Sequence, residues 1–338
     1  MNSNKIDRPR LLITMGDVAG IGPEIIAKAW PALTTMAIPI VVGDRYWLEQ
    51  SIRLVSSPCK IKCIGATQEA RPTPEEIPLL EVTKQDLSSV KSGQICAAAG
   101  QSAYDFLKHA ISLTLKGEAD GIVTCPLHKA GLHAAGLKYP GHTEILAELT
   151  NSPEFAMLLY GDGLAVAHVT LHMALRQIFA NITISSVLEK IKLLNHWLPP
   201  LLGGRPARLA VAAVNPHAGD EGLFGDEEEK IIRPAVQLAR TEGIQVTGPL
   251  PADTLFVRAH RGEFDGIIAM YHDEGHIAMK LRSGMRCVNI TAGLPIIRTS
   301  VAHGTAYDIA GKGIASGDSL IAATEVASKL SSWLKKSN

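Results

Sequence analysis

Net charge, long apolar runs and paired cysteines are all scarce in this chain of 338 residues, and each scarcity excludes a class of protein. The 33 Lys and Arg residues equal the 33 Asp and Glu residues, so no basic field can hold nucleic acid or an anionic membrane surface. No stretch reaches the roughly 18 apolar residues of a membrane-spanning helix, and residues 1–10 lack the apolar core of a signal peptide. The five cysteines are scattered, and no second pair completes a zinc knuckle. We therefore expect a cytoplasmic protein with reduced thiols that binds neither nucleic acid nor membrane.

The composition is that of a packed protein, with 46% hydrophobic and 20% charged residues. A chain of this length suits two lobes. Predicted strands alternate with predicted helices, so we expect an α/β fold with mostly parallel sheets and one antiparallel hairpin around residues 161–163. The expected strands are 11–14, 38–42, 121–124, 155–160, 164–170, 209–214, 266–270 and 288–290. One helix is expected to begin at Pro23, and four more are expected at 93–116, 185–197, 227–241 and 318–335.

A glycine-rich turn, residues 16–22, joins the first strand to the first helix. It does not have the spacing G-x-G-x-x-G and lacks the lysine of a Walker loop, so it predicts neither a Rossmann fingerprint nor a P-loop. It still places Asp17 and several backbone amides near the end of a sheet.

Three histidines follow predicted strands: His172, His217 and His272. Ligand groups gather past the carboxyl ends of strands in α/β sheets, so three imidazoles there could hold a divalent ion. The alternative is that each is a structural histidine, and spacing alone leaves both interpretations open. For His168 and His276 we expect surface positions rather than contact with the ligands.

Polar residues elsewhere fit an anion. His142 and Thr143 open a predicted helix whose free N–H groups suit a phosphate; the alternative is that Thr143 only caps that helix. Lys280, Asn289 and Arg298 could each bind phosphate or carboxylate oxygens, or simply be solvated. The acidic run 227–229 is expected to be a solvated helix face.

The segment 301–315 has too many glycines and polar groups for a buried strand, and it can wrap a ligand with its backbone. It resembles the adenosine-binding loop of the metal-dependent β-decarboxylating dehydrogenases. That resemblance implies an NAD(P) site formed by His303, Gly304, Thr305, Asp308 and Gly311.

Motifs in order along nearly the whole chain resemble the 4-hydroxythreonine-4-phosphate dehydrogenase family. They lie at 13–24, 141–144, 215–219, 251–254, 271–273 and 289–300. The resemblance implies two α/β domains in the isocitrate/isopropylmalate dehydrogenase architecture with a cleft between them, a cofactor-side domain of residues 1–135 plus 295–338 and a metal, substrate and dimerisation domain of residues 136–294. It also implies a homodimer whose metal site is shared across the interface. By the same resemblance the metal ligands are His172, His217 and His272, and the substrate contacts are His142, Thr143, Lys280, Asn289 and Arg298.

The expected reaction is the NAD-dependent oxidation of the C3 hydroxyl of a 4-phosphorylated four-carbon acid, followed by loss of CO2. Lys280 is expected to donate a proton or hold the carboxylate, with Asp253 or Asp273 as the base. Zn²⁺ is the expected ion, with Mg²⁺, Mn²⁺ or Co²⁺ as alternatives. Two departures from the family pattern stand out: Val18 replaces a proline, and Ala302 replaces an aspartate beside the cofactor loop, which leaves the choice between NAD and NADP open.

The local motifs favour the branch that acts on 4-phospho-D-threonate or 4-phospho-D-erythronate. The alternative branch acts on 4-phosphohydroxy-L-threonine in pyridoxal 5′-phosphate synthesis. Two rivals of other classes remain. A metallohydrolase would leave the 301–315 loop without a role, and the intact predicted ligands argue against a binding protein that keeps the fold without turnover.

Overall fold

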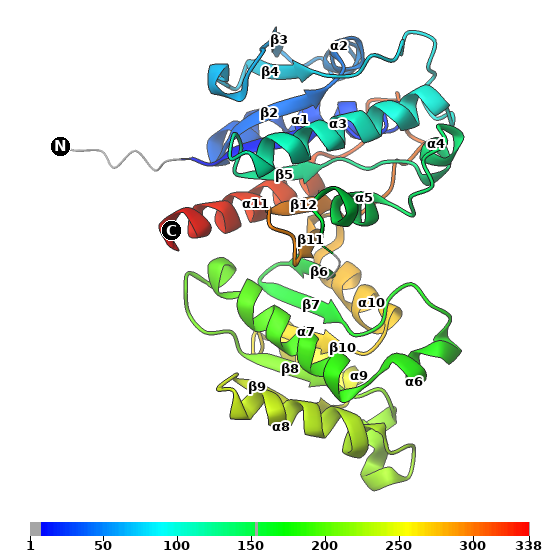
Figure 1. Cartoon of the computed structure of the whole chain (residues 1–338), viewed down its shortest axis with the longest axis vertical. Helices are drawn as coiled ribbons and strands as arrows, with labels where there is room; N and C mark the ends of the chain where they lie inside the picture. The colour runs from blue at the N-terminus through cyan, green and yellow to red at the C-terminus, as the bar shows by residue number, and fades with distance from the viewer. Residues whose placement is uncertain (1–7, 153–154, 338) are drawn as a thin grey trace, which may run out of the picture. The chain divides into compact units, whose positions relative to one another are not determined.

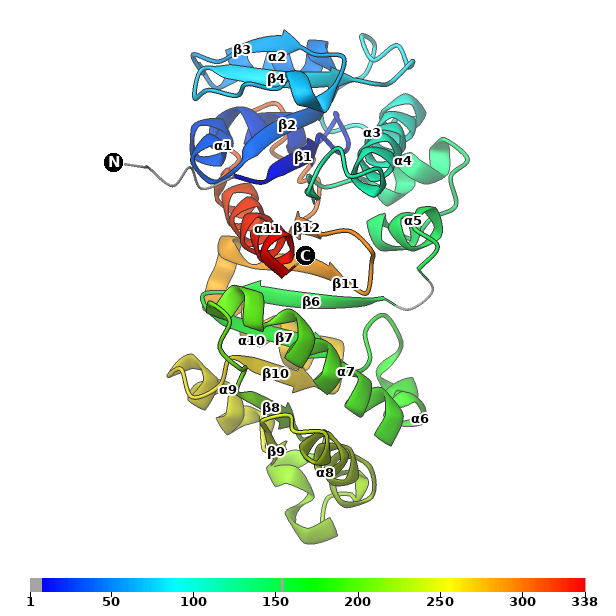
Figure 2. The same cartoon turned by 60° about the vertical axis from the view of Figure 1, so that its left-hand side comes forward.

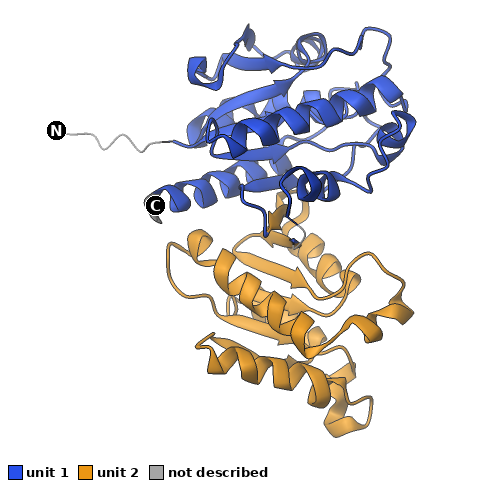
Figure 3. Ribbon diagram, in the orientation of Figure 1, with its two compact units in different colours: residues 1–155, 293–338 blue, residues 156–292 orange. Residues whose placement is uncertain are grey.

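The computed structural model describes residues 8–152 and 155–337, which divide into two compact units (Figure 3). Unit 1 comprises Met1–Phe155 and Gly293–Asn338, and unit 2 comprises Ala156–Ala292. The sequence placed these boundaries after residues 135 and 294. The first differs because helix α5 (His142–Leu149) packs against helix α3 (Ala97–Leu115) in unit 1. Residues 1–7, part of the segment searched for a signal peptide, lie outside the described residues.

Unit 1 is built on a sheet whose named strands all pair in parallel. Its strands, in spatial order, are β3 (Lys60–Cys63), β4 (Glu76–Glu81), β2 (Ile38–Gly43), β1 (Arg10–Thr14), β5 (Gly121–Thr124) and β12 (Arg298–Val301). Central strands such as β1 and β5 read as short continuous apolar runs because both of their faces are buried. The parallel arrangement places the carboxyl ends of β1, β5 and β12 at one edge.

Helices cover both faces of this sheet (Figures 1 and 2). On one face α1 (Gly22–Met36) contacts α2 (Arg45–Leu54) and α11 (Asp318–Ser337). On the other face α3 contacts α4 (Lys129–Ala134) as well as α5. Pro23 lies in the first turn of α1, as expected.

Unit 2 combines the predicted hairpin with a parallel block of strands. Its strands, in spatial order, are β11 (Val288–Ala292), β6 (Ala156–Gly161), β7 (Leu164–His168), β10 (Gly266–Ala269), β8 (Leu209–Ala212) and β9 (Val246–Leu250). Strands β6 and β7 pair antiparallel through a tight turn at Asp162 and Gly163, both with positive φ. Strands β7, β10, β8 and β9 are parallel, so the prediction of mostly parallel α/β sheets is confirmed for both units.

The helices of unit 2 again lie on both faces of the sheet. They are α6 (Ile178–Asn181), α7 (Ile184–Trp197), α8 (Arg233–Thr241), α9 (Ala252–His260) and α10 (His272–Ser283), with a π-helical turn at Glu228–Ile232 before α8. The sequence did not predict α2, α4, α6, α9, α10, β9 or β12. In α10 only Gly275, Met279 and Ser283 are buried, which leaves almost no apolar periodicity to detect. Across the described part of the chain, no helix is long and apolar enough to cross a membrane.

The buried carboxylate of Asp265 joins the starts of two neighbouring strands in unit 2. It accepts a bidentate pair of hydrogen bonds from Arg205 (2.6 and 2.8 Å) and three more from Arg208, one of them from its backbone N–H. Burial by itself raises the pKa of Asp265, but the hydrogen bonds from the two arginines together outweigh it and hold that pKa well below its usual range. The carboxylate thereby fixes the segment before β8 against the segment before β10.

We predict that Asp265→Asn lowers the free energy of unfolding by about 2 kcal/mol, because two guanidinium groups lose their shared acceptor and each of them is about half exposed and screened. Since the folded-state pKa lies below the unfolded value near 3.9, this stabilisation is present above that pH and is lost as the pH falls further. Urea unfolding at neutral and acidic pH measures both effects. The surface control Glu263→Gln, which removes only an exposed partner of Arg258, should change stability by less than about 1 kcal/mol; equal losses in the two variants would contradict the prediction.

Candidate active site

At the carboxyl edge of the unit 1 sheet, the loops after β1, β5 and β12 lock together through their backbones. The N–H of Asp17 donates to the carbonyl of Pro126 (3.0 Å), and the N–H of Ile21 donates to the carbonyl of Thr305 (3.1 Å). Gly16 has φ +70°, and a Cβ there would lie 2.3 Å from the Pro126 oxygen. This approach requires glycine, which explains why the turn 16–22 is glycine-rich without being a nucleotide fingerprint.

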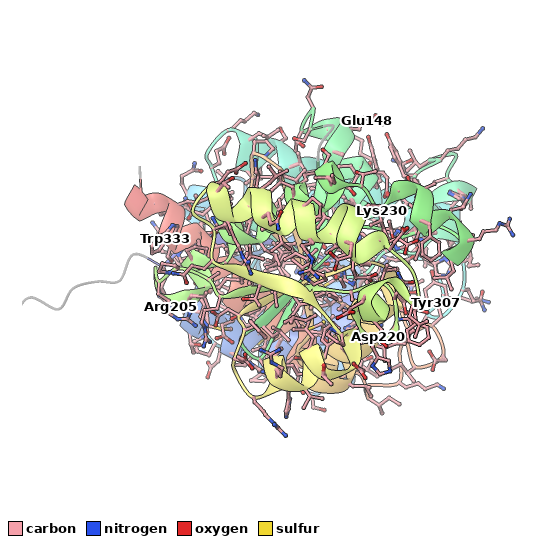
Figure 4. All side chains as sticks on the ribbon, turned by 90° about the horizontal axis from the view of Figure 1, so that it is seen from below. Glu148, Arg205, Asp220, Lys230, Tyr307 and Trp333 are labelled. Atoms are coloured by element: carbon pink, nitrogen blue, oxygen red, sulfur yellow. The ribbon has the colours of Figure 1, made fainter. Side chains whose placement is uncertain are left out.

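A buried carboxylate anchors the predicted cofactor loop to this edge. Asp17 is fully buried; it accepts hydrogen bonds from the N–H of Ala19 (2.9 Å) and from the hydroxyl of Tyr307 (2.8 Å). The imidazole of His128 stacks on the Tyr307 ring at 4.5 Å. Burial raises the pKa of Asp17, and burial and then the Asp17 charge raise the pKa of Tyr307, so the tyrosine remains a donor at neutral pH. Tyr307, labelled in Figure 4, therefore ties the loop to the turn that follows β1.

The five residues predicted to bind the cofactor follow β12 and lie on this anchored loop. Thr305 is buried, whereas Gly304, Asp308 and Gly311 are exposed and His303 is half-buried. The backbone has positive φ at Ala306 (45°) and Gly311 (74°), so the loop winds tightly and presents main-chain groups. An exposed loop of this kind, with small side chains and one carboxylate, fits the hydroxyl groups of a nucleotide.

The predicted phosphate contacts of unit 1 form a second group. His142 opens α5, and the residue before it, Gly141, is the N-cap without any side-chain hydrogen bond. The alternative that Thr143 only caps the helix is therefore wrong. The guanidinium of Arg298, which is buried, donates to the hydroxyl of Thr124 at 2.7 Å.

Electrostatics support an anion here. Burial lowers the pKa of Arg298 to about 9, against the opposing influence of Glu144. Burial, and then the charge of Arg298, hold the pKa of His142 well below its usual range, so its imidazole is neutral. A buried cation beside a neutral hydrogen-bonding ring and a helix N-terminus is a favourable place for a phosphate.

In unit 2, four imidazoles gather where β7 and β10 end. The rings of His172 and His272 have centroids 5.8 Å apart, and His276 stacks on His272 at 3.7 Å. The Nδ1 atom of His276 lies 3.1 Å from Nε2 of His168. His168 is buried, so its predicted surface position is wrong, and both residues contact the cluster around a predicted ligand. Burial lowers the pKa of His168 to about 3 and that of His276 to about 4, which leaves both rings neutral.

One ring of this cluster is oriented as metal-binding histidines usually are. Nδ1 of His272 lies 2.6 Å from a carboxylate oxygen of Asp273. A carboxylate partner on Nδ1 leaves Nε2 to face a cation, so this donor set fits a divalent ion. Within one copy of the chain, however, the described residues contain no group of three His, Cys, Asp or Glu side chains that could hold a metal ion.

The third predicted ligand, His217, is exposed on the turn after β8, where its ring lies 6.4 Å from that of Phe224. It lines a largely apolar groove of about 830 Å³ in unit 2. Both candidate bases, Asp253 at the start of α9 and Asp273 at the start of α10, line the same groove. Lys280 is exposed farther along α10, and Asn289 lies on β11 opposite Leu159.

Sequence analysis missed two carboxylates near these ligands, one half-buried and one fully buried. Glu274 lines the groove and accepts a hydrogen bond from the N–H of Met270 (2.5 Å), and burial raises its pKa to about 7. Glu228 is buried, so the solvated face predicted for 227–229 is wrong at that position and holds for exposed Glu229. The sequence shows acidic residues beside His272 and at a helix start, but no pattern in it indicates that Glu274 is half-buried and Glu228 fully buried.

Known proteins resemble the chain over nearly its whole length. The profile of the family described as pyridoxal phosphate biosynthetic protein PdxA matches residues 35–327. The D-threonate 4-phosphate dehydrogenase of Cupriavidus necator is 46% identical over 326 residues, covering 95% of this chain and 97% of that protein. The 4-hydroxythreonine-4-phosphate dehydrogenase of Trichlorobacter lovleyi is 43% identical over 328 residues, covering 96% and 98%. A crystal structure of 4-hydroxythreonine-4-phosphate dehydrogenase from Klebsiella pneumoniae has a TM-score of 0.86 and 42% identity, covering 96% of this chain and 99% of that one.

Fold, site and relatives together define the class: this is an α/β oxidoreductase that acts on a CH–OH group. The chain belongs to the PdxA family. The family resemblance read from its motifs is thereby confirmed, and the metallohydrolase and non-catalytic alternatives lose their support.

We predict that Tyr307→Phe lowers the free energy of unfolding by about 1–2 kcal/mol, because the buried Asp17 carboxylate loses a hydrogen-bond donor that water cannot replace. Chemical denaturation of the two proteins measures the difference. The matched control is Tyr46→Phe at a residue that is 46% exposed, and it should be nearly neutral. A Tyr307→Phe protein as stable as the wild type would show that the hydroxyl does not anchor the loop.

Proposed function

We propose that the protein catalyses the NAD-dependent, divalent-metal-dependent oxidation of the C3 hydroxyl of a 4-phosphorylated four-carbon acid, with subsequent β-decarboxylation. The substrate is 4-phospho-D-threonate or 4-phospho-D-erythronate, and the products are dihydroxyacetone phosphate and CO2. The observation that carries this proposal is the paired imidazoles of His172 and His272, with Asp273 orienting His272. The name of the 46% identical relative, D-threonate 4-phosphate dehydrogenase, supports the substrate class.

Atoms and electrons balance in this reaction with NAD as the hydride acceptor. Oxidation at C3 releases a hydride and a proton and leaves a β-keto acid. Loss of CO2 from C1 leaves an enolate, and one proton converts it to the ketone. When bound, a divalent ion would supply Lewis acidity for the hydroxyl and the enolate, and a nicotinamide would accept the hydride. Imidazole ligands favour Zn²⁺, with Mg²⁺, Mn²⁺ or Co²⁺ as alternatives.

The chain's own residues would bind and orient the substrate. In unit 1 the buried Arg298 guanidinium, neutral His142 and Thr143 would hold the phosphate. In unit 2 Asn289 and Lys280 would hold the carboxylate, and Lys280 could return the proton to the enolate.

The candidate base and the cofactor loop can also be assigned roles. Because Asp273 is engaged with His272, Asp253 is the better placed base. On the cofactor loop, exposed Asp308 would accept from ribose hydroxyls and repel a 2′-phosphate, which favours NAD over NADP.

We further propose a homodimer in which a second copy completes the metal site, with His172, His217 and His272 as its ligands. Two observations support it. One copy alone brings no suitable group of three ligands together among the described residues. Helix α10 also exposes apolar side chains along the groove that His217 lines, with Leu281 83% and Ile277 57% exposed. Apolar surface of this kind is typical of a subunit interface.

The substrate assignment is tested by following formation of the reduced nicotinamide with NAD and each of three acids: 4-phospho-D-threonate, 4-phospho-D-erythronate and 4-phosphohydroxy-L-threonine. We expect kcat/KM for one of the first two to exceed that for the third by at least about tenfold, or roughly 1.4 kcal/mol in transition-state binding.

EDTA should abolish turnover and added Zn²⁺ should restore it. His272→Ala should lose both metal and turnover, whereas His196→Ala, an exposed histidine on α7, should keep both. Preference for the third acid would assign the protein to the vitamin-synthesis branch, and full activity in metal-free His272→Ala would refute the metal role.

For the dimer, we predict that Leu281→Glu converts the protein to monomers and removes metal binding, because a charge would be buried in an apolar interface. Sedimentation velocity and metal content of the purified protein are the measurements. Leu238→Glu, an exposed apolar position on α8, serves as the control and should leave the dimer intact. A wild-type protein that is monomeric and fully active would overturn this part of the proposal.

A further inference from the structure

The turn that carries His217 has an unusual backbone. Five consecutive residues, 217–221, have positive φ values of 55°, 58°, 81°, 44° and 56°, and only Gly219 among them is a glycine. Each non-glycine residue in the left-handed region costs roughly 1 kcal/mol or more. Such a segment persists only when its surroundings hold it in place. Figure 4, which views the chain from below, labels Asp220 in this turn and Lys230 on the helix that follows.

Three backbone hydrogen bonds link the two ends of the turn. The carbonyl of Gly219 accepts from the N–H of Phe224 (3.1 Å), and the carbonyl of Asp220 accepts from the N–H of Leu223 (3.1 Å). The N–H of Ala218 donates to the carbonyl of Asn215 (3.2 Å). These bonds close the turn on itself, but they do not attach it to the sheet from which His217 must be presented.

The buried carboxylate of Glu228 supplies that attachment. Its side chain is 1% exposed. One oxygen, Oε1, accepts from the backbone N–H groups of Val214 (2.9 Å) and Asn215 (2.8 Å), the residues that lead from β8 into the turn. The other oxygen, Oε2, accepts from the side-chain amide of Asn215 at 2.9 Å. The second amide hydrogen of Asn215 is directed to Glu227, whose Oε2 lies 2.6 Å away.

The same carboxylate also lies directly beneath the left-handed residues. A Cβ built on Gly219 would be 2.9 Å from Oε2 of Glu228. The carboxylate therefore contacts the middle of the turn while binding both N–H groups at its start, and the Asn215 amide completes the contact. Substituting Glu228 or Asn215 would therefore remove hydrogen bonds at the residues that lead directly into the left-handed turn.

We propose that Glu228 and Asn215 are positioning residues for His217: they hold the left-handed turn in the one conformation that presents its imidazole to a divalent cation. This inference rests on the proposed function, because it assumes that His217 is a metal ligand. The inference goes beyond the proposed function because it makes the affinity for the cation depend on the Glu228 carboxylate and the Asn215 amide, which are not themselves proposed as metal ligands. Groups that orient metal ligands typically change metal affinity by 10- to 100-fold when they are mutated.

The test is the dissociation constant for Zn²⁺ of chelator-treated dimeric enzyme, measured by competition with a chromophoric chelator. Glu228→Gln keeps the shape of the side chain and one oxygen for the two backbone N–H groups, but it sets an amide nitrogen against the donor of Asn215. We expect Zn²⁺ binding to weaken by about 10- to 100-fold, with the circular dichroism spectrum and the dimer retained. The matched control is Glu229→Gln, the neighbouring exposed glutamate, which loses only its ion pair with Arg233 and should bind Zn²⁺ as the wild type does.

A rescue variant separates positioning from general destabilisation. In Glu228→Gln combined with Asn215→Asp and Glu227→Gln, both new amide nitrogens can donate to the new carboxylate, so we expect part of the lost Zn²⁺ affinity to return. If Glu228→Gln does not fold, Asn215→Ala provides the second variant. It removes one donor and leaves the backbone N–H bonds to Glu228 in place, so it should weaken Zn²⁺ binding several-fold without unfolding the protein.

The outcomes distinguish this inference from the proposed function. If His217→Ala binds Zn²⁺ as tightly as the wild type, the proposed metal site itself fails. If His217→Ala weakens Zn²⁺ binding while folded Glu228→Gln or Asn215→Ala binds it normally, the metal site stands and the positioning role is refuted. Weaker binding in all three variants, with rescue in the triple variant, is the expected result.

Discussion

The predicted metal ligands of unit 2 and the predicted cofactor loop of unit 1 both depend on one constraint, the register in which parallel strands pair. In unit 2, Ala269 of β10 pairs with His168 of β7, and Ile268 pairs with Val211 of β8, so the three following segments leave the sheet at one edge. In unit 1, Thr124 of β5 plays the same role between β1 and β12. Every group assigned to the cofactor loop or to the metal follows one of these strands. A shift of register in either sheet would separate them.

Buried charges recur at the functional loops, and three of them are held by nearby neutral groups. Asp17 uses an amide and a tyrosine hydroxyl, and Glu228 uses two amides and an asparagine side chain. Arg298 donates to a threonine hydroxyl. Because such bonds would leave unsatisfied polar groups if they broke, they hold the loops rigidly. The functional loops of both units are thus fixed before any ligand binds, which lowers the entropy lost on binding.

The errors of sequence analysis share one physical origin. His168 and Glu228 read as surface residues because polar side chains are usually solvated, yet both are buried against partners that the sequence does not reveal. Helix α10 was not predicted because its first turn consists of His272 and acidic residues, which do not pack in the core and so give no apolar periodicity. Local patterns are weakest where function takes the place of packing.

What the sequence determined by itself was local or ordered along the chain: the strand and helix types with strong periodicity, the hairpin at Asp162 and Gly163, and the series of motifs that placed the chain in its family. Only the tertiary structure decided which polar groups meet. His276 contacts His168, which lies 108 positions away in the sequence, and Tyr307 donates a hydrogen bond to Asp17, which lies 290 positions away. Periodicity reports which face of an element is buried, whereas contacts between distant residues follow from strand order and packing, which no local pattern contains.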